Sequence, residues 1–304
     1  MVRRTFRARE RPGPLLERLH EERRSRPALP LPSRSPGPSR APLPTDPVDL
    51  PPLPAAFHDA VAAGCAAWGI SLDTAQLAAL DHHARLLVAW TSAINLTAVR
   101  EPQRVAVVHV LDSLSAVPLL RRLARPGPRL ADLGSGGGYP GLPLVVALPA
   151  ETGVLVESVA KKGRFLQVAA DAAMSALAAG RPPGDRSPSV RVEARRAEAL
   201  AADPTTAGSF DVVTVRAVGS LAAVAALALP LLREGGTLVA WKRDGGDGRL
   251  AAELEAAVPT VLALGGDRPR IEPLPPGVAD LATHRLVVVQ RVRELPGGGH
   301  RLLG

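Results

Sequence analysis

The stretch ADLGSGGGYPGLPL, residues 131–144, joins the end of an apolar run to four glycines in five positions and then to a Tyr-Pro-Gly turn. Glycine has no Cβ, so this backbone can take positive φ angles and approach a flat or charged ligand that side chains would block. Pro140 and Pro143 suit the first turn of a following helix, where a missing N–H costs nothing. The order of strand, glycine loop and helix N-terminus predicts a nucleotide site in an open α/β sheet.

Short β-like runs alternate with alanine-rich helical stretches from residue 129 onward. Strands are predicted at 129–134, 153–157, 190–194, 210–215, 236–241 and 284–291, and helices near 140–148, 160–179, 219–232 and 249–258. Such alternation predicts a mostly parallel sheet covered by helices on both faces. Residues 126–304 are therefore interpreted as a Rossmann-like α/β domain.

A helical pattern occupies residues 55–125, ahead of the predicted sheet. Leu77, Leu80, Leu87 and Trp90 recur at helical spacing, with Asp73 or Thr74 available as the N-cap. We expect three or more helices there, forming a layer against the sheet domain.

Residues 1–54 differ in composition from the rest of the chain. They hold 13 of the 31 prolines and 11 arginines against six acids, with little periodic apolar pattern. Too little apolar surface is available to offset the entropy of ordering, so we predict a disordered arm. Such an arm is either a source of nonspecific contacts to RNA phosphates or a dispensable extension.

The remaining composition narrows the class of protein. The 304 residues are 46% hydrophobic, and the sequence has no uninterrupted apolar run of about 18 residues. The basic start lacks the apolar stretch of a secretory signal, so we expect a cytoplasmic protein that does not contact a membrane. The single cysteine, Cys65, is expected to pack in the core. The net charge of +8 suits a nucleic-acid partner, although a GC-rich genome would also supply many arginines.

Two carboxylates near the glycine loop bear on the choice of ligand. Gly136, Gly138 and Gly141 satisfy G-x-G-x-x-G, which is a weak signal for a dinucleotide. Asp132 ends the first strand, where it could orient loop amides or face the cationic methionine end of S-adenosylmethionine. Glu157 follows the second strand, where a carboxylate takes both ribose hydroxyls of NAD or S-adenosylmethionine equally well. Together with Asp132, this favours S-adenosylmethionine, although Glu157 by itself indicates a ribose and does not distinguish the two cofactors.

Further candidates follow the third and fourth strands or begin the helix predicted at 160–179. Glu198 lies in a turn that would sit beside an adenine, or is ordinary helix-start charge. Arg216, at the carboxyl end of a central strand, is predicted to point into the cleft. Lys161 and Lys162 form the exposed basic start of an amphipathic helix.

Six motifs occur in a fixed order along the chain. They are WTSAINLTAVREP (90–102), HVLDSL (109–114), DLGSGGGYPGLPL (132–144), ES followed by KKGRFL (157–166), RAE (196–198) and FDVVTVRA (210–217). Together they resemble the RsmG (GidB) family, which methylates N7 of a guanine in bacterial 16S ribosomal RNA with S-adenosylmethionine. The resemblance spans about residues 60–292, and it departs from the family pattern at Thr91, Ser92 and Val108 on the RNA-facing side.

The resemblance implies a Rossmann-like class I methyltransferase sheet, mostly parallel, with an N-terminal helical layer and a disordered N-terminal arm. Family motifs and spacing together give these expected cofactor-binding residues: Asp132, Gly134, Ser135, Gly136, Gly138, Tyr139, Glu157, Ala197, Glu198 and Arg216. The candidates for the RNA side of the cleft are Asn95, His109, Asp112, Ser113, Lys161, Lys162 and Lys242. The implied partner is 16S rRNA in the small ribosomal subunit or its assembly intermediate, and no oligomer is expected.

The implied chemistry needs no general base, because guanine N7 carries an in-plane lone pair that can attack a sulfonium methyl directly. No catalytic residue is therefore assigned, and the seven histidines show no metal-ligand spacing. Three alternatives remain: a methyltransferase of the same fold acting on a small molecule or protein, an NAD-dependent oxidoreductase, and an RNA-binding assembly factor with a vacant pocket.

Overall fold

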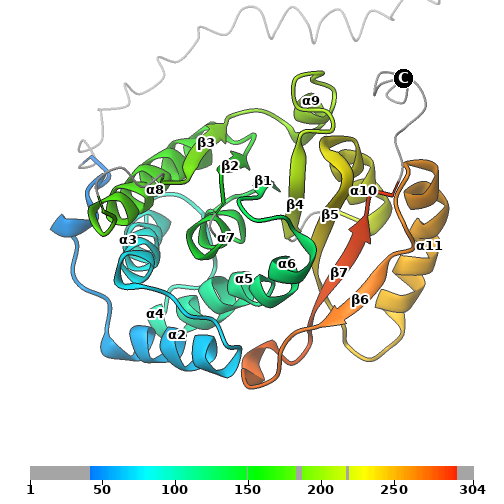
Figure 1. Ribbon diagram of the computed structural model, residues 1–304. Helices are drawn as coiled ribbons and strands as arrows, with labels where there is room; N and C mark the ends of the chain where they lie inside the picture. The colour runs from blue at the N-terminus through cyan, green and yellow to red at the C-terminus, as the bar shows by residue number, and fades with distance from the viewer. Residues whose placement is uncertain (1–41, 149, 183–186, 217–218, 293–304) are drawn as a thin grey trace, which may run out of the picture. The chain divides into compact units, whose positions relative to one another are not determined.

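A seven-stranded sheet runs through the middle of the structure in the order β3-β2-β1-β4-β5-β7-β6 (Figure 1). The computed structural model describes residues 42–148, 150–182, 187–216 and 219–292. The strands are β1 (Arg129–Leu133), β2 (Thr152–Val156), β3 (Ser189–Glu193), β4 (Phe210–Arg216), β5 (Leu232–Arg243), β6 (Arg270–Pro273) and β7 (His284–Gln290).

Five strands, β3 to β5 in sheet order, are parallel, while β7 pairs antiparallel with both β5 and β6. The expectation of a mostly parallel sheet is confirmed. β5 is longer than expected, beginning at Leu232 rather than at residue 236. β6 was not predicted, because this edge strand has only four residues and ends in Pro273, so it carries almost no periodic signal.

Alternate residues of each strand face opposite sides of the sheet, and each side has its own core. Leu130 and Val212 belong to one hydrophobic cluster, whereas their neighbours Ala131 and Val213 belong to the other. This period of two follows from the pleat of the strands. The parity of a residue therefore decides which helices its side chain meets.

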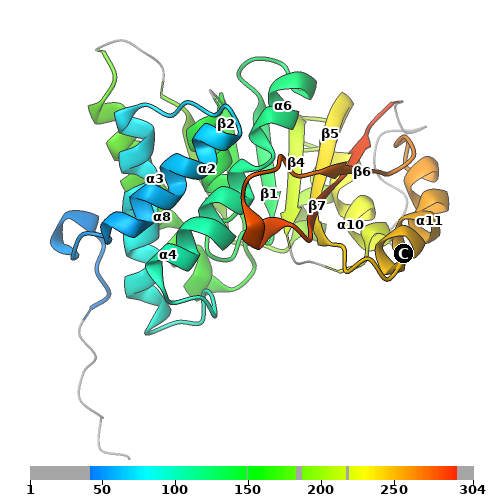
Figure 2. The same cartoon turned by 90° about the horizontal axis from the view of Figure 1, so that it is seen from below.

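Helices cover both faces of the sheet, as expected. The first face carries α7 (Gly141–Ala147), α8 (Ala160–Ala179) and the helical layer, and the second carries α9 (Ala197–Ala201), α10 (Leu221–Ala228), η3 (Leu229–Leu231) and α11 (Arg249–Ala263). Figure 2 shows the strands between the helical layer on one side and α10 and α11 on the other.

The helical layer comprises α2 (Ala55–Ala67), α3 (Thr74–Thr91), α4 (Pro102–Val105), the π-helical turn η2 (Ala106–Leu111), α5 (Asp112–Leu114) and α6 (Val117–Leu123). Asp73 is the N-cap of α3, and its side chain and that of Gln76 each bond to the other residue's backbone N–H in a capping box. Cys65 is buried in this layer, as expected.

One continuous helical stretch, Pro102–Leu123, has the length and mean hydropathy (1.2) of a membrane span. Of its most apolar window, 67% is buried inside the structure, where Val105, Leu114 and Leu120 are fully covered. Its apolar residues therefore serve the protein core.

The disordered arm was predicted to extend to residue 54, but its last residues are ordered. Residues 43–54 include a short helix, η1 (Pro47–Asp49), and pack on α3: Trp90 Nε1 donates to the Pro44 carbonyl, and Arg85 donates to the carbonyls of Leu50 and Pro51. Backbone carbonyls in a proline-rich chain remain good acceptors, which the compositional argument overlooked. Residues 1–41 of the predicted arm lie outside the described residues. A final short turn, η4 (Ala279–Leu281), precedes β7.

Candidate cofactor pocket and the polar network beside it

A cavity of about 190 Å³ opens at the carboxyl ends of β1, β2 and β4 and beside the turn that follows β3. Both apolar and charged side chains line it. It is lined by Leu133, Gly134, Val156, Glu157, Ser158, Arg195, Arg196, Ala197, Glu198, Val215, Val224 and Leu227. A narrow apolar space with a few polar groups suits a planar ring carrying a hydroxylated substituent.

Glu157 is the buried acid of this pocket, with 7% of its surface exposed. Its Oε2 accepts from the Gly136 amide at 3.1 Å, and its Oε1 accepts from the Val159 amide at 2.8 Å. A carboxylate has about four acceptor positions, so these two bonds orient the group and leave acceptors for a ligand. Glu157 can therefore bind ribose hydroxyls while holding the loop in place.

The Asp132 side chain accepts a hydrogen bond from the backbone at the end of the glycine loop. Asp132 is fully buried, and its Oδ2 accepts from the Gly141 amide at 3.2 Å while its Oδ1 accepts from the Thr214 hydroxyl at 2.7 Å. Burial raises the pKa of this carboxyl. Of the two roles expected for Asp132, the geometry supports the orientation of loop amides, because the side chain does not line the pocket.

Tyr139, the aromatic residue of the loop, is enclosed by two histidines. Its ring stacks on His83 of α3 with centroids 4.3 Å apart and on His109 of η2 with centroids 5.0 Å apart. The Arg216 guanidinium lies 5.6 Å from the same ring centroid. The helical layer thus contacts the loop through aromatic stacking, and the Tyr139 hydroxyl has no hydrogen-bond partner among the described residues.

Both histidines are neutral at physiological pH. Burial lowers the pKa of His83 to about 4, and burial together with the Arg216 charge lowers that of His109 to about 4. His83 Nε2 lies 2.7 Å from the Gly137 carbonyl, which can only accept, so Nε2 carries the hydrogen. Arg216 can only donate, so His109 Nδ1 accepts from it at 3.4 Å, and the His109 hydrogen on Nε2 is donated to Thr97 Oγ1 at 2.7 Å.

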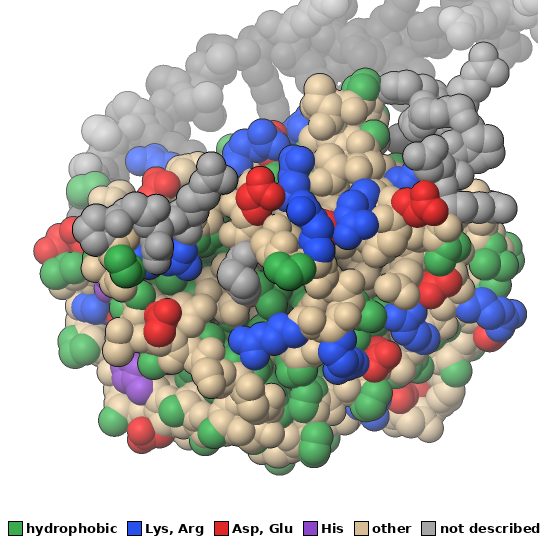
Figure 3. Space-filling model, viewed as in Figure 1, with side chains coloured by type: hydrophobic (Ala, Val, Ile, Leu, Met, Phe, Trp, Pro, Cys, Tyr) green, Lys and Arg blue, Asp and Glu red, His purple; other side chains and the backbone are tan. Residues whose placement is uncertain are grey.

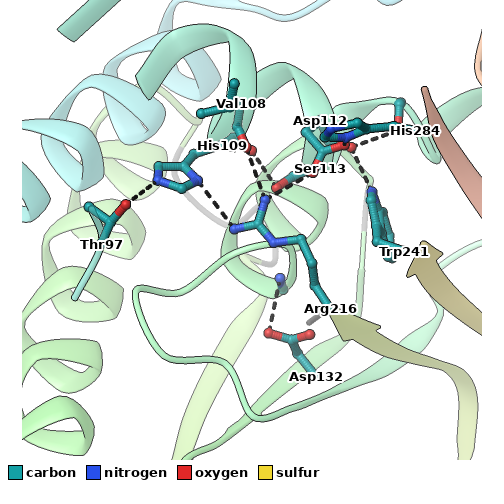
Figure 4. A network of polar contacts seen from close by, with 11 residues as sticks. Thr97, Val108, His109, Asp112, Ser113, Asp132, Arg216, Trp241 and His284 are labelled. Carbon is teal, nitrogen blue, oxygen red and sulfur yellow. Dashed lines mark hydrogen bonds and ion pairs between the residues drawn. The ribbon is translucent and has the colours of Figure 1, made fainter. Parts of the chain in front are cut away.

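Arg216 faces the helical layer, beside the glycine loop, and is not among the residues that line the pocket (Figure 4). Its Nη1 donates to Asp112 Oδ2 at 3.0 Å and to the Val108 carbonyl at 3.2 Å. The reason is parity: Val215 lines the pocket from the second face, so the next residue of β4 points to the first.

The predicted residues separate into three groups by position. Gly134, Glu157, Ala197 and Glu198 line the pocket. Asp132, Ser135, Gly136, Gly138 and Tyr139 build or support the loop outside that lining, and Ser135 Oγ donates to the Asp132 carbonyl. Arg216, His109 and Asp112 meet in the network of Figure 4.

The other RNA-side candidates lie apart from that network or have different partners. Ser113 is fully buried and donates to the His109 carbonyl within its own helix. Lys242 Nζ donates to Glu253 at 2.7 Å and to the Gly219 carbonyl at 3.0 Å, which ties the segment after β4 to α11. Asn95 and Lys161 are exposed, and Lys162 is half-buried, at the start of α8.

Several residues of this region were missed by sequence reasoning. His83 shares the buried face of α3 with Leu80 and Leu87, and this apolar spacing is the signal that could have placed it inside. His284 begins β7, and its Nδ1 lies 2.7 Å from Asp112 Oδ1. Trp241 Nε1 donates to the Asp112 carbonyl at 2.8 Å. Neither residue has a local signal, because its partner lies more than 100 positions away.

Known proteins resemble this chain in the region that contains the pocket and most of the polar network. A family model described as rRNA small subunit methyltransferase G matches residues 76–257. Proteins with the name ribosomal RNA small subunit methyltransferase G include one from Sorangium cellulosum, 42% identical over 212 residues, which is 70% of this chain and 81% of that protein. The one from Rubrobacter xylanophilus is 37% identical over 240 residues, or 78% of this chain and 85% of that protein.

The residues that the family model matches include the glycine loop, the pocket and most of the helical layer. With identities well above 30% and more than two thirds of each relative covered, this chain belongs to the rRNA small subunit methyltransferase G family.

Proposed function

We propose that this protein transfers a methyl group from S-adenosylmethionine to N7 of a guanine in 16S ribosomal RNA. The observation that carries the proposal is the pocket at the carboxyl ends of β1, β2 and β4, in a chain of this methyltransferase family. The partner is 16S rRNA in the small subunit or an assembly intermediate, and the site of action is the cytoplasm, where ribosomes are assembled.

The pocket fits the adenosine part of the cofactor. Leu133, Val156 and Val215 offer apolar contact to an adenine ring, and Glu157 retains acceptor positions for ribose hydroxyls. Gly134 has a φ of +74°, so a side chain there would be strained as well as obstructive. Glu198 also lines the pocket.

S-adenosylmethionine supplies the activated methyl group, and the nucleophile is the lone pair of guanine N7. The protein therefore has no proton to remove, and its task is to hold the two reactants in line. Such alignment contributes up to about 7–11 kcal/mol in well-oriented systems. The neutral state of His109 fits this task, because it can orient groups beside the cleft without exchanging a proton near neutral pH.

A basic rim beside the pocket is a candidate surface for RNA phosphates. It consists of Lys161, Lys162, Arg164 and Arg196, none of which has a side-chain ion pair with a described residue. The two parts of the rim adjoin, because a Cβ at Gly163 would lie 3.7 Å from Ala194. On the face in Figure 3, several Lys and Arg side chains lie close together with Asp and Glu side chains beside them.

Cofactor binding is tested by calorimetry with S-adenosylhomocysteine and with NAD. The wild type should bind the first and not the second, which separates the proposal from an oxidoreductase. Glu157→Ala should weaken binding at least tenfold, whereas Glu151→Ala, at the other end of β2 and exposed, should leave it unchanged. Equal affinity in both variants would remove Glu157 from the site.

Methyl transfer is tested on purified small ribosomal subunits and by mapping 16S rRNA. A strain that lacks the protein should lose one 7-methylguanosine. Transfer to a small molecule or protein but not to subunits would favour a different substrate class, and binding to subunits without transfer would favour an assembly factor.

The basic rim is tested by the double variant Lys161→Glu with Lys162→Glu. We expect weaker binding to subunits and a shallower salt dependence, with affinity for S-adenosylhomocysteine retained. The matched control is Arg121→Glu with Arg122→Glu on α6, before the amino end of β1, which should bind subunits as the wild type does.

A further inference from the structure

Asp112 is held from three neighbouring strands at once. His284 of β7 lies 2.7 Å from its Oδ1, Arg216 of β4 lies 3.0 Å from its Oδ2, and Trp241 of β5 donates to its backbone carbonyl at 2.8 Å. Figure 4 shows these three side chains converging on the start of α5. The junction of the helical layer with the sheet is therefore a polar one.

The pleat of the sheet explains why these side chains meet. Arg216 pairs with Trp241 in the register of β4 and β5, and Trp241 pairs with Leu286 in that of β5 and β7. His284 lies two residues before Leu286 and so faces the same side of the sheet. All three polar side chains thus emerge on the first face, under the helical layer.

Each oxygen of the Asp112 carboxylate has its own charged or polar partner. The residue is only 2% exposed, so an oxygen that lost its partner would be left without water. If the His284 donor were removed, the carboxylate would gain by turning both oxygens toward the Arg216 guanidinium, which forms bidentate pairs readily. That rotation would draw Arg216 away from the Val108 carbonyl and from His109 Nδ1, its other acceptors.

We propose that His284 is a positioning residue: by occupying Oδ1 of Asp112 it fixes the Arg216 guanidinium over Tyr139 and against His109. The residue lies beyond the part of the chain that the family model matches, which ends at 257. The effect of His284 on catalysis rests on the proposed function, whereas its effect on Arg216 and His109 does not.

The expected kinetic effect of His284→Ala is a fall of about tenfold in kcat for methyl transfer, since small misplacements of site groups have effects of this size or larger. The KM for S-adenosylmethionine should change less than about twofold, because no network residue lines the pocket wall. His284→Asn should restore most of the activity, because its amide nitrogen takes the place of Nδ1. His284→Gln puts its donor at the Nε2 position and should not.

The control for a merely structural role is Leu286→Ala. Leu286 is 1% exposed on the same strand and the same face, so its truncation destabilises β7 while both Asp112 oxygens keep their partners. If Leu286→Ala lowers kcat as much as His284→Ala does, at equal loss of stability, the positioning role is overturned.

A readout without RNA or cofactor is the ¹⁵N spectrum of the His109 ring. In the wild type Nδ1 accepts from Arg216 and Nε2 carries the hydrogen. His284→Ala should shift the Nδ1 resonance, His284→Asn should restore it, and Leu286→Ala should leave it in place. An unshifted resonance in His284→Ala would refute the proposal. If the resonance responds but the wild type methylates no subunits, the proposed function has failed and the positioning role stands.

Discussion

Acid should destabilise this protein through the two histidines that enclose Tyr139, and His83 allows the clearest test. Burial lowers its pKa from 6.5 to about 4. Its Nε2–H is donated to the Gly137 carbonyl, and its Nδ1 has no partner among the described residues. Protonation would therefore place a charge on a buried nitrogen with nothing to stabilise it.

The sign and size follow from proton linkage. A histidine with a lowered folded-state pKa contributes stability that is fully present above pH 6.5 and is lost as the pH falls toward 4. The difference between the folded-state and unfolded-state pKa of His83 corresponds to about 3 kcal/mol of folding stability, of which about 2 kcal/mol is lost by pH 5. His109, with a pKa also near 4, should lose a similar amount in the same range.

The assay compares urea unfolding of the wild type and of His83→Gln at pH 7.5 and at pH 5. Glutamine keeps an N–H for the Gly137 carbonyl but does not titrate, so other groups cancel in the comparison. Between the two pH values, the variant should lose about 2 kcal/mol less stability than the wild type. Equal losses in the two proteins would show that His83 is not buried as a neutral ring, and the reasoning would fail.

Substitutions at three further positions test the loop. Tyr139→Phe removes a buried hydroxyl that has no partner among the described residues, and should raise the free energy of unfolding by about 1 kcal/mol in urea titrations; a loss would reveal a hidden partner. Gly138→Ala should lower the free energy of unfolding by about 2 kcal/mol, because φ at this residue is +86° and the new Cβ would lie 2.8 Å from the His83 ring. The same change should weaken S-adenosylhomocysteine binding in calorimetry. Unchanged stability and affinity would contradict this geometry. Asp132→Asn can keep the bonds to Gly141 and Thr214, so it should lower the free energy of unfolding by less than about 1 kcal/mol. Asp132→Ala loses both bonds and should lower it by about 2 kcal/mol more, as measured by thermal unfolding. Equal losses in the two variants would argue against an orienting role for Asp132.

Local patterns predicted most of the sheet and the position of the loop. β1 and β4 were placed to within one residue, because their apolar runs end at the glycine loop and at Arg216. Glu157 was placed at a strand end by its distance from the loop, and the structure puts it at the pocket. Such features depend on a few successive residues and on the geometry of a parallel sheet.

Other features depend on segments that the chain brings together from far apart. The packing of residues 43–54 on α3 uses backbone carbonyls, which composition does not reveal. The four residues of β6 do not themselves favour a strand; they form one by pairing with the backbone of β7. The enclosure of Tyr139 requires α3 and η2 to meet over the loop.

The direction of Arg216 illustrates the division most clearly. The apolar run 210–215 is enough to predict that Arg216 ends a buried strand and that its side chain points to the opposite face from Val215. Which face meets the pocket is visible only in the folded chain, where Val215 lines the pocket and Arg216 contacts His109 and Asp112. The physical reason is that the pleat fixes which residues share a face, whereas the packing of the helices decides what each face meets.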